Sequence, residues 1–125
     1  MSDLKPIKNN LKKVEKGWGH ELWIVNNNLY CGKILHFNKN SKFSMHYHLQ
    51  KDETWYVLSG EFILRYIDGN NAEIKEKKLK KDDSITIPKG LPHQLETIDG
   101  GEIMEVSTQH FENDSFRISK GDSQI

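Results

Sequence analysis

The sequence predicts a single all-β domain, built as a sandwich or a barrel. Short runs rich in Ile, Val, Tyr, Phe and Trp recur from residue 18 onward, and clusters of Asn, Asp, Gly and Pro separate them. Runs of this kind at regular spacing, without a long helical segment, are typical of strands joined by turns. The chain has 125 residues, which corresponds to one domain.

The predicted strands are short and closely spaced. They cover residues 18–25, 29–37, 43–48, 53–59, 61–67, 72–79, 84–87, 93–98 and 102–108. Asp68-Gly69 and Asp99-Gly100 lie between such runs, and both dipeptides tolerate the positive φ that tight hairpins require.

The run 53–59 has large apolar side chains on both of its faces. Trp55 and Val57 share one face, and Tyr56 and Leu58 share the other. A strand that is apolar on both sides is covered on both sides. We therefore expect one face to line the barrel and the other to pack against a second sheet or a dimer partner.

Two polar segments flank the predicted barrel, which we place at residues 17–112. Residues 1–16 form an N-terminal arm, whose apolar side chains lie three or four positions apart at Leu4, Ile7, Leu11 and Val14. That spacing allows an amphipathic helix. A proline and an Asn-Asn pair within the arm weaken that interpretation, so an arm packed on the barrel or on a partner is an equal alternative. Residues 113–125 form a polar C-terminal tail that we expect to be loosely held.

Charge and cysteine content argue against several classes of function. Lysine and arginine together number 18, as do aspartate and glutamate, so the chain has no general electrostatic affinity for nucleic acid or acidic membranes. The lysine-rich run 75–81 fits a solvated strand face. The one cysteine, Cys31, cannot form an intrachain disulfide, and no stretch resembles a signal peptide or a membrane span. We expect a cytoplasmic protein that binds neither nucleic acid nor membrane.

Four residues form a candidate metal site. His46 and His48 are two positions apart in a predicted strand, so their side chains point to the same face. The residues between His48 and Glu53 allow a turn that returns the Glu53 carboxylate beside the two imidazoles. The Pro- and Gly-containing turn at residues 88–92 then places His93 at the start of another strand.

Three imidazoles and one carboxylate suit a single divalent transition metal such as Mn, Fe, Zn, Co or Ni. Such a set leaves coordination positions open on the metal, as a catalytic site requires. The other histidines, His20, His36 and His110, have no comparable context, and we interpret them as structural or surface residues.

These residues resemble the two sequence motifs of the cupin superfamily. The first reads His46-x-His48-x₄-Glu53-x₆-Gly60, and the second reads Pro88-x-Gly90-x-x-His93. The resemblance implies a double-stranded β-helix, the cupin or jelly-roll barrel, with a metal bound inside it and often a homodimer. Three motif positions depart from the family: Asn40 and Asp82 replace glycines, and Thr97 replaces an asparagine.

A closer resemblance, from about residue 15 to residue 116, is to the type II mannose-6-phosphate isomerase module. It is carried by Lys16-Gly17-Trp18-Gly19-His20-Glu21, Cys31-Gly32-Lys33-Ile34-Leu35, Glu53-x-Trp55-Tyr56-Val57-Leu58-Ser59-Gly60, Ile87-Pro88-x-Gly90-x-Pro92-His93 and Glu105-Val106. The chain departs from that module in the first motif, where Lys51 replaces the family's arginine. A lysine attracts a phosphate but does not hold it in a planar fork. The module's C-terminal Tyr-Gly-Arg element is also missing after Arg117.

The resemblance implies an enzyme that isomerises a small sugar or sugar phosphate with the help of the metal. In that reading Lys51 or Lys33 contacts a phosphate and Tyr66 moves a proton. Two alternatives stay open. One is an iron-dependent dioxygenase or other small-molecule cupin enzyme, and the other is a non-catalytic protein in which the metal only orients a ligand.

Overall fold

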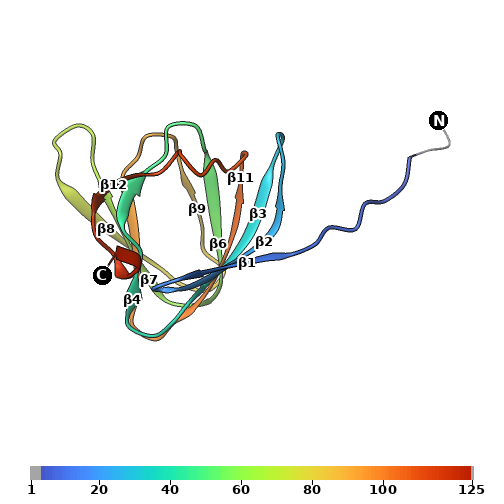
Figure 1. Ribbon diagram of the computed structural model, residues 1–125. Coiled ribbons are helices and arrows are strands. Elements are labelled where there is room, and N and C mark those ends of the chain that lie inside the picture. The colour runs from blue at the N-terminus through green and yellow to red at the C-terminus, as the bar shows by residue number, and fades with distance from the viewer. Residues whose placement is uncertain (1–3, 125) are drawn as a thin grey trace.

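The computed structural model describes residues 4–124, and they form an all-β jelly-roll barrel of two antiparallel sheets (Figure 1). The first sheet has the order β1 (Lys12–Lys16), β2 (Gly19–Asn26), β3 (Cys31–Phe37), β11 (Gly101–Ser107), β6 (Glu53–Gly60) and β9 (Ser84–Ile87). The second has the order β12 (Phe116–Ser119), β5 (Met45–Tyr47), β10 (His93–Thr97), β7 (Phe62–Ile67) and β8 (Ile74–Leu79), with β4 (Ser41–Lys42) also paired to β10. The predicted all-β fold is confirmed.

An apolar core fills much of the space between the sheets. The Trp18 ring stacks on Phe37 at 4.5 Å between ring centroids, and Phe37 meets Phe62 edge-on at 5.1 Å. Leu95 and Ile103, one from each sheet, are fully buried. Burial of this apolar surface is the main favourable contribution to folding. The core therefore fixes the spacing at which polar residues from the two sheets face one another.

The strand β6 has the two different faces that its sequence indicates. Trp55 and Val57 are each 1% exposed and belong to the core, whereas Tyr56 lies on the outer face of the first sheet and is 38% exposed. On that face the strand register places Tyr56 beside Met104, Met104 beside Ile34 and Ile34 beside Leu22. A row of four large side chains thus crosses the outside of the sheet.

Each of the three motif departures has a clear place in the structure. Asn40 has a φ of 53° and Asp82 a φ of 75°, both in the left-handed region. Asn and Asp are the residues besides glycine that adopt this region most readily. Thr97 is buried, and its hydroxyl donates to the Glu61 carbonyl at 2.8 Å and accepts from the Gly100 amide at 3.1 Å.

Both ends of the chain differ in part from their expected form. Residues 12–16 of the arm add β1 to the edge of the first sheet through backbone pairing with β2, and residues 4–11 extend away from the barrel without forming a helix (Figure 1). The C-terminal segment 113–124 is not loosely held. Its strand β12 pairs with β5, and the Asp122 carboxylate accepts the Lys42 amide at 2.7 Å. These contacts join backbone and polar groups, so hydrophobic patterning gives no sign of them.

No helix within residues 4–124 is both long and apolar enough to cross a membrane.

Replacing Gly60 with alanine should destabilise the barrel. Gly60 has a φ of +84°, and an added Cβ would lie 2.2 Å from the Gly100 carbonyl oxygen. Strain of this kind costs of order 1–3 kcal/mol, measurable as the free energy of unfolding in urea. A Cβ at Gly69 would meet no atom within 4 Å, so Gly69→Ala is the control. Equal stability of the two variants would contradict this account of the turn.

Candidate metal centre

Three imidazoles converge inside the barrel, as the sequence predicts. His46 on β5 and His93 on β10 are direct partners in the antiparallel ladder, and His48 follows β5 by one residue. Their candidate ligand atoms all lie within 4.8 Å of one another. Since a bound metal sits about 2.0–2.1 Å from each ligating imidazole nitrogen, this cluster is close to the size that one ion needs.

Hydrogen bonds fix the orientation of each ring. Every one of the three histidines directs its Nδ1 at a backbone carbonyl, so Nδ1 carries the proton and Nε2 keeps its lone pair. The acceptors are Ser44 O at 2.7 Å from His46, Asp114 O at 2.7 Å from His48 and Leu91 O at 2.8 Å from His93. This is the arrangement that metal-binding histidines use.

The three rings are held neutral. Burial, together with the neighbouring His48, lowers the pKa of His46 to about 4. Burial also lowers the pKa of His48, and that of His93 well below its usual value. His93 Nε2 is buried and makes no hydrogen bond to any described residue. An unpaired buried acceptor is costly, and a metal ion would satisfy it.

Glu53 reaches the same point from the other sheet. Its Oε2 lies 3.5 Å from His48 Nε2 and its Oε1 lies 3.7 Å from His93 Nε2. Glu53 stands at the start of β6, and its side chain is 2% exposed. Burial raises the pKa of this carboxyl to about 7, and the nearby Glu105 adds to the increase. The three histidines and Glu53 thus form one enclosed cluster between the sheets.

Lys51 is not available as a free phosphate contact. Its Nζ lies 3.1 Å from Glu53 Oε2 and 3.1 Å from Glu105 Oε2, and its side chain is 4% exposed. Burial alone would lower the pKa of Lys51, but the two carboxylates raise it above its usual value. The ammonium is therefore charged and already paired on both sides.

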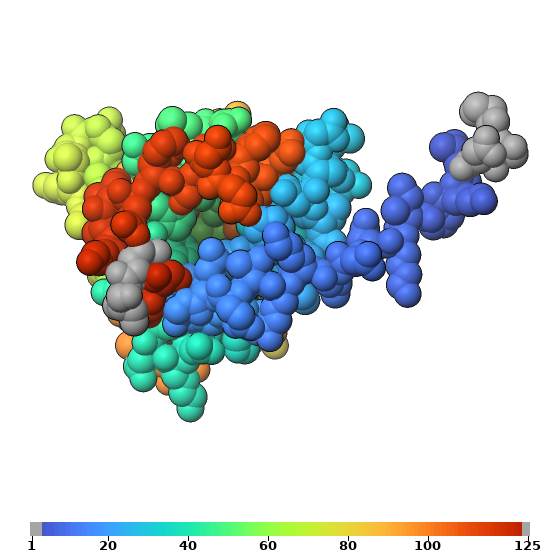
Figure 2. Space-filling view, in the orientation of Figure 1, coloured from blue at the N-terminus to red at the C-terminus, as the bar shows by residue number. Residues whose placement is uncertain are grey.

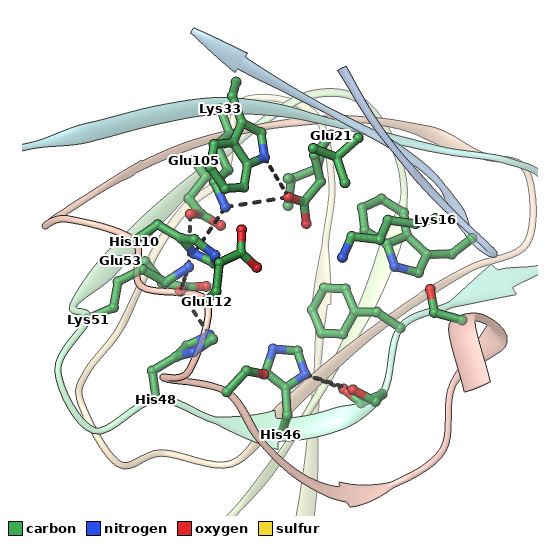
Figure 3. Close-up of a pocket in the computed structure, with 18 of the residues that line it drawn as sticks. Lys16, Glu21, Lys33, His46, His48, Lys51, Glu53, Glu105, His110 and Glu112 are labelled. Atoms are coloured by element: carbon green, nitrogen blue, oxygen red, sulfur yellow. Dashed lines mark hydrogen bonds and ion pairs between the residues drawn. The ribbon is translucent and has the colours of Figure 1, made fainter. Parts of the chain in front are cut away.

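Lys33 lies in the same cavity, at a second cluster. Its Nζ is 3.4 Å from Glu21 Oε1, 3.2 Å from His110 Nδ1 and 4.2 Å from the centroid of the Trp23 ring. Figure 3 shows Glu21 and Lys33 at the end of the cavity away from His46 and His48. His110, interpreted from the sequence as structural or on the surface, is instead a cavity residue.

Tyr66 lies outside the wall of the cavity. It is the ladder partner of His93 on β7, and its side chain packs against the apolar core. The residues that line the cavity do not include it. The structure therefore gives no support to a proton-moving role for Tyr66.

The cavity has a volume of about 230 Å³. This is below the ~300–1,000 Å³ of typical drug-sized pockets and fits a small ligand. Its wall includes Val14 and Lys16 of β1, and His110, Glu112 and Ser115 of the chain between β11 and β12. Figure 2 shows these two parts of the chain, blue and red, on either side of a hollow in the surface.

Sequence reasoning missed four carboxylates of this site: Glu21, Glu105, Glu112 and Asp114. A signal existed for one of them, because Glu105 alternates with Ile103 on the inward face of β11, where an apolar residue would be expected. Glu21 and Asp114 carry no comparable signal, since a carboxylate in a polar stretch is ordinarily solvated.

Asp114 connects the C-terminal segment to the metal cluster. Its carbonyl accepts from His48, and its carboxylate accepts the backbone amides of Leu49, Gln50 and Lys51 at 2.8–3.2 Å. The residue is 2% exposed. Asp114 therefore orients both a candidate ligand and the loop that carries Lys51.

Replacing Asp114 with alanine should weaken metal binding by roughly 10–100-fold, the usual effect of losing a group that orients a ligand. The loop amides lose their acceptor, so the position of His48 becomes less well defined. The dissociation constant for Co²⁺, with the Co²⁺ absorption spectrum as a probe of ligand geometry, would measure this. Asp99→Ala removes an exposed carboxylate and is the control. Unchanged affinity and spectrum in Asp114→Ala would refute the assignment.

Comparison with known proteins agrees with the fold and the motif. The family model described as the cupin domain matches residues 33–108. None of the curated proteins matches the sequence significantly.

Solved structures share the architecture. Oxalate decarboxylase from Bacillus subtilis superposes with a TM-score of 0.78 at 17% identity, over 94% of this chain and 34% of that one. The capsular polysaccharide assembling protein CapF from Staphylococcus aureus gives a TM-score of 0.74 at 19% identity, over 88% of this chain and 34% of its own. The chain thus spans about a third of the length of these structures, and at such identities the likeness shows the fold alone. Together with the family match over residues 33–108, the motif and the barrel establish that this protein belongs to the cupin family.

Proposed function

We propose that this protein is a metal-dependent enzyme that acts on a small sugar or sugar phosphate by isomerase-type proton transfer. One observation carries the proposal: three imidazoles, each oriented by a backbone acceptor, converge within the barrel, and two of them, His46 and His48, line a cavity of about 230 Å³. A purely structural metal site has no need of an adjoining polar cavity, whereas an enzyme needs one to receive its substrate.

His46, His48, His93 and Glu53 are the proposed ligands of one divalent ion among Mn, Fe, Zn, Co and Ni. Neutral imidazoles and a single carboxylate suit these metals. Mn²⁺ is the first to test, because the oxalate decarboxylase neighbour is described with Mn(II) centres. When bound, such an ion would polarise a substrate carbonyl and stabilise negative charge on its oxygen.

The chain's own residues would move the proton and hold the substrate. Aldose–ketose isomerisation transfers a proton between adjacent carbons and needs a base in contact with the substrate. Besides Glu53, the carboxylates that line the cavity are Glu21, Glu105 and Glu112, so one of these would act as the base. Since Lys51 is already paired with two carboxylates, a substrate phosphate would instead meet Lys16, an exposed residue of the same wall.

A homodimer and a cytoplasmic location also stay proposals. The dimer is supported by the row Leu22, Ile34, Met104 and Tyr56 on the outside of the first sheet. A twofold axis would place this row against its own copy, as isologous interfaces do.

Metal affinity should increase as the pH rises toward 7. A proton on Glu53, whose pKa is about 7, competes with the metal for the carboxylate. His46, with a pKa of about 4, is already neutral over the same range and contributes little. Below pH 7 the affinity for Mn²⁺ should therefore change up to about tenfold per pH unit. Titrations of the wild type and of Glu53→Gln would test this, and an equally steep dependence in the variant would contradict the role of Glu53.

Mannose 6-phosphate should be converted to fructose 6-phosphate by the protein loaded with Mn²⁺, Zn²⁺, Co²⁺ or Fe²⁺. In His48→Ala the rate should fall to that of metal-free protein, because a ligand is lost. His20→Ala is the matched control, since His20 stacks on His36 away from the metal cluster.

Absence of product with every metal would refute the isomerase proposal. Oxygen uptake with Fe²⁺ alone would then favour the dioxygenase alternative. Tight binding of a ligand without turnover would favour a non-catalytic protein.

A further inference from the structure

The second charged cluster of the cavity has no part in the metal site. It consists of Glu21 and Trp23 on β2, Lys33 on β3 and His110 in the chain that follows β11, and we call it the Lys33 wall. All four residues line the same cavity as His46 and His48.

The burial of Lys33 has no structural reason on its own strand. Its next inward-facing neighbours on β3, Leu35 and Phe37, belong to the apolar core, and the Lys33 side chain is only 2% exposed. Removing an ammonium from water is offset only when its partners are close and well aligned. The Lys33–Glu21 distance of 3.4 Å is longer than the ~2.7–2.9 Å of a strong charge-assisted hydrogen bond. The pair is therefore loose enough to accept a further polar partner.

The Lys33 wall offers donors and an acceptor to a ligand. Glu21 Oε1 accepts from Trp23 Nε1 at 2.8 Å and from Lys33, and Figure 3 shows the second carboxylate oxygen of Glu21 directed into the cavity. Burial and the neighbouring Lys33 lower the pKa of His110 to about 3, so its ring is neutral. With Nδ1 accepting from Lys33, the other ring nitrogen carries a proton that it can donate.

The charges of this wall cancel, because Lys33 carries one positive charge, Glu21 one negative charge and His110 none. A phosphate would be repelled by Glu21, and a cation by Lys33. A hydroxyl group both donates and accepts, so it satisfies a carboxylate and an ammonium at once. Uncharged hydroxyl groups therefore match the wall better than any ion.

We propose that the Lys33 wall is a recognition site for neighbouring hydroxyl groups of a polyhydroxylated substrate, whose carbonyl end faces the three histidines. This inference extends the proposed function. It rests on that function for the statement that the substrate carbonyl faces the three histidines. It assigns the sugar hydroxyls to Glu21, Lys33 and His110, of which Glu21 and Lys33 lie at the end of the cavity away from His46 and His48.

Calorimetric titration of the metal-loaded full chain with D-mannose, an uncharged polyhydroxy aldehyde, tests the proposal. Glu21→Gln keeps the shape of the side chain and removes its charge, and Lys33→Met removes the ammonium. Each should lower the affinity for mannose at least tenfold and leave metal stoichiometry unchanged. Glu102→Gln and Lys13→Met, which alter exposed residues outside the cavity, are the matched controls. Thermal unfolding of each variant separates loss of binding from loss of fold.

Two results of the mannose titration would overturn the proposal. One is wild-type protein that binds no mannose, and the other is mannose binding in both wall variants as strong as in the wild type. Inorganic phosphate is the second probe, and binding of phosphate that depends on Lys33 would also contradict a hydroxyl site. Mannose binding that depends on the Lys33 wall, with no conversion of mannose 6-phosphate by any metal-loaded form, would contradict the isomerase proposal and support the hydroxyl site.

Discussion

The enclosure of charge between two sheets is the constraint on which the rest of the structure depends. A small barrel of this kind stabilises itself by apolar burial, yet this one encloses two lysines and two glutamates that are almost fully buried. Each ammonium inside must lie against a carboxylate, because an isolated buried charge is too costly to retain. Lys51 meets this requirement with Glu53 and Glu105, and Lys33 meets it more loosely with Glu21.

The backbone carbonyls that orient the three clustered histidines come from both nearby and distant parts of the chain. For His46 and His93, the carbonyl that orients the ring belongs to the residue two positions earlier, so each short segment brings its own acceptor. For His48 the acceptor is Asp114, which is 66 positions away in the sequence. The cluster is therefore complete only when the C-terminal segment has docked.

The sequence predicted the barrel and the proximity of His46, His48 and His93 for a physical reason. Alternation on strands and the spacing His46-x-His48 are local signals, and turn residues such as Gly60 and Gly90 report backbone conformations directly. The state of Lys51 could not be predicted, because its partner Glu105 comes from a strand 54 positions away. The same holds for His110, whose place in the cavity depends on the path of a segment with no hydrophobic pattern. Tyr66 shares a ladder position with His93, and only the packing of the core decides that it is not in the wall.

The hydrogen bonds of Asp114 couple two processes, the docking of the C-terminal segment and the binding of a metal at His48. If docking of the C-terminal segment favours metal binding by aligning His48, then metal binding must favour docking of the segment by the same free energy. Residues of that segment also line the cavity. A metal that binds at His48 would therefore also order this part of the cavity wall. The metal would thus act on the wall of its own cavity as well as on a substrate inside it.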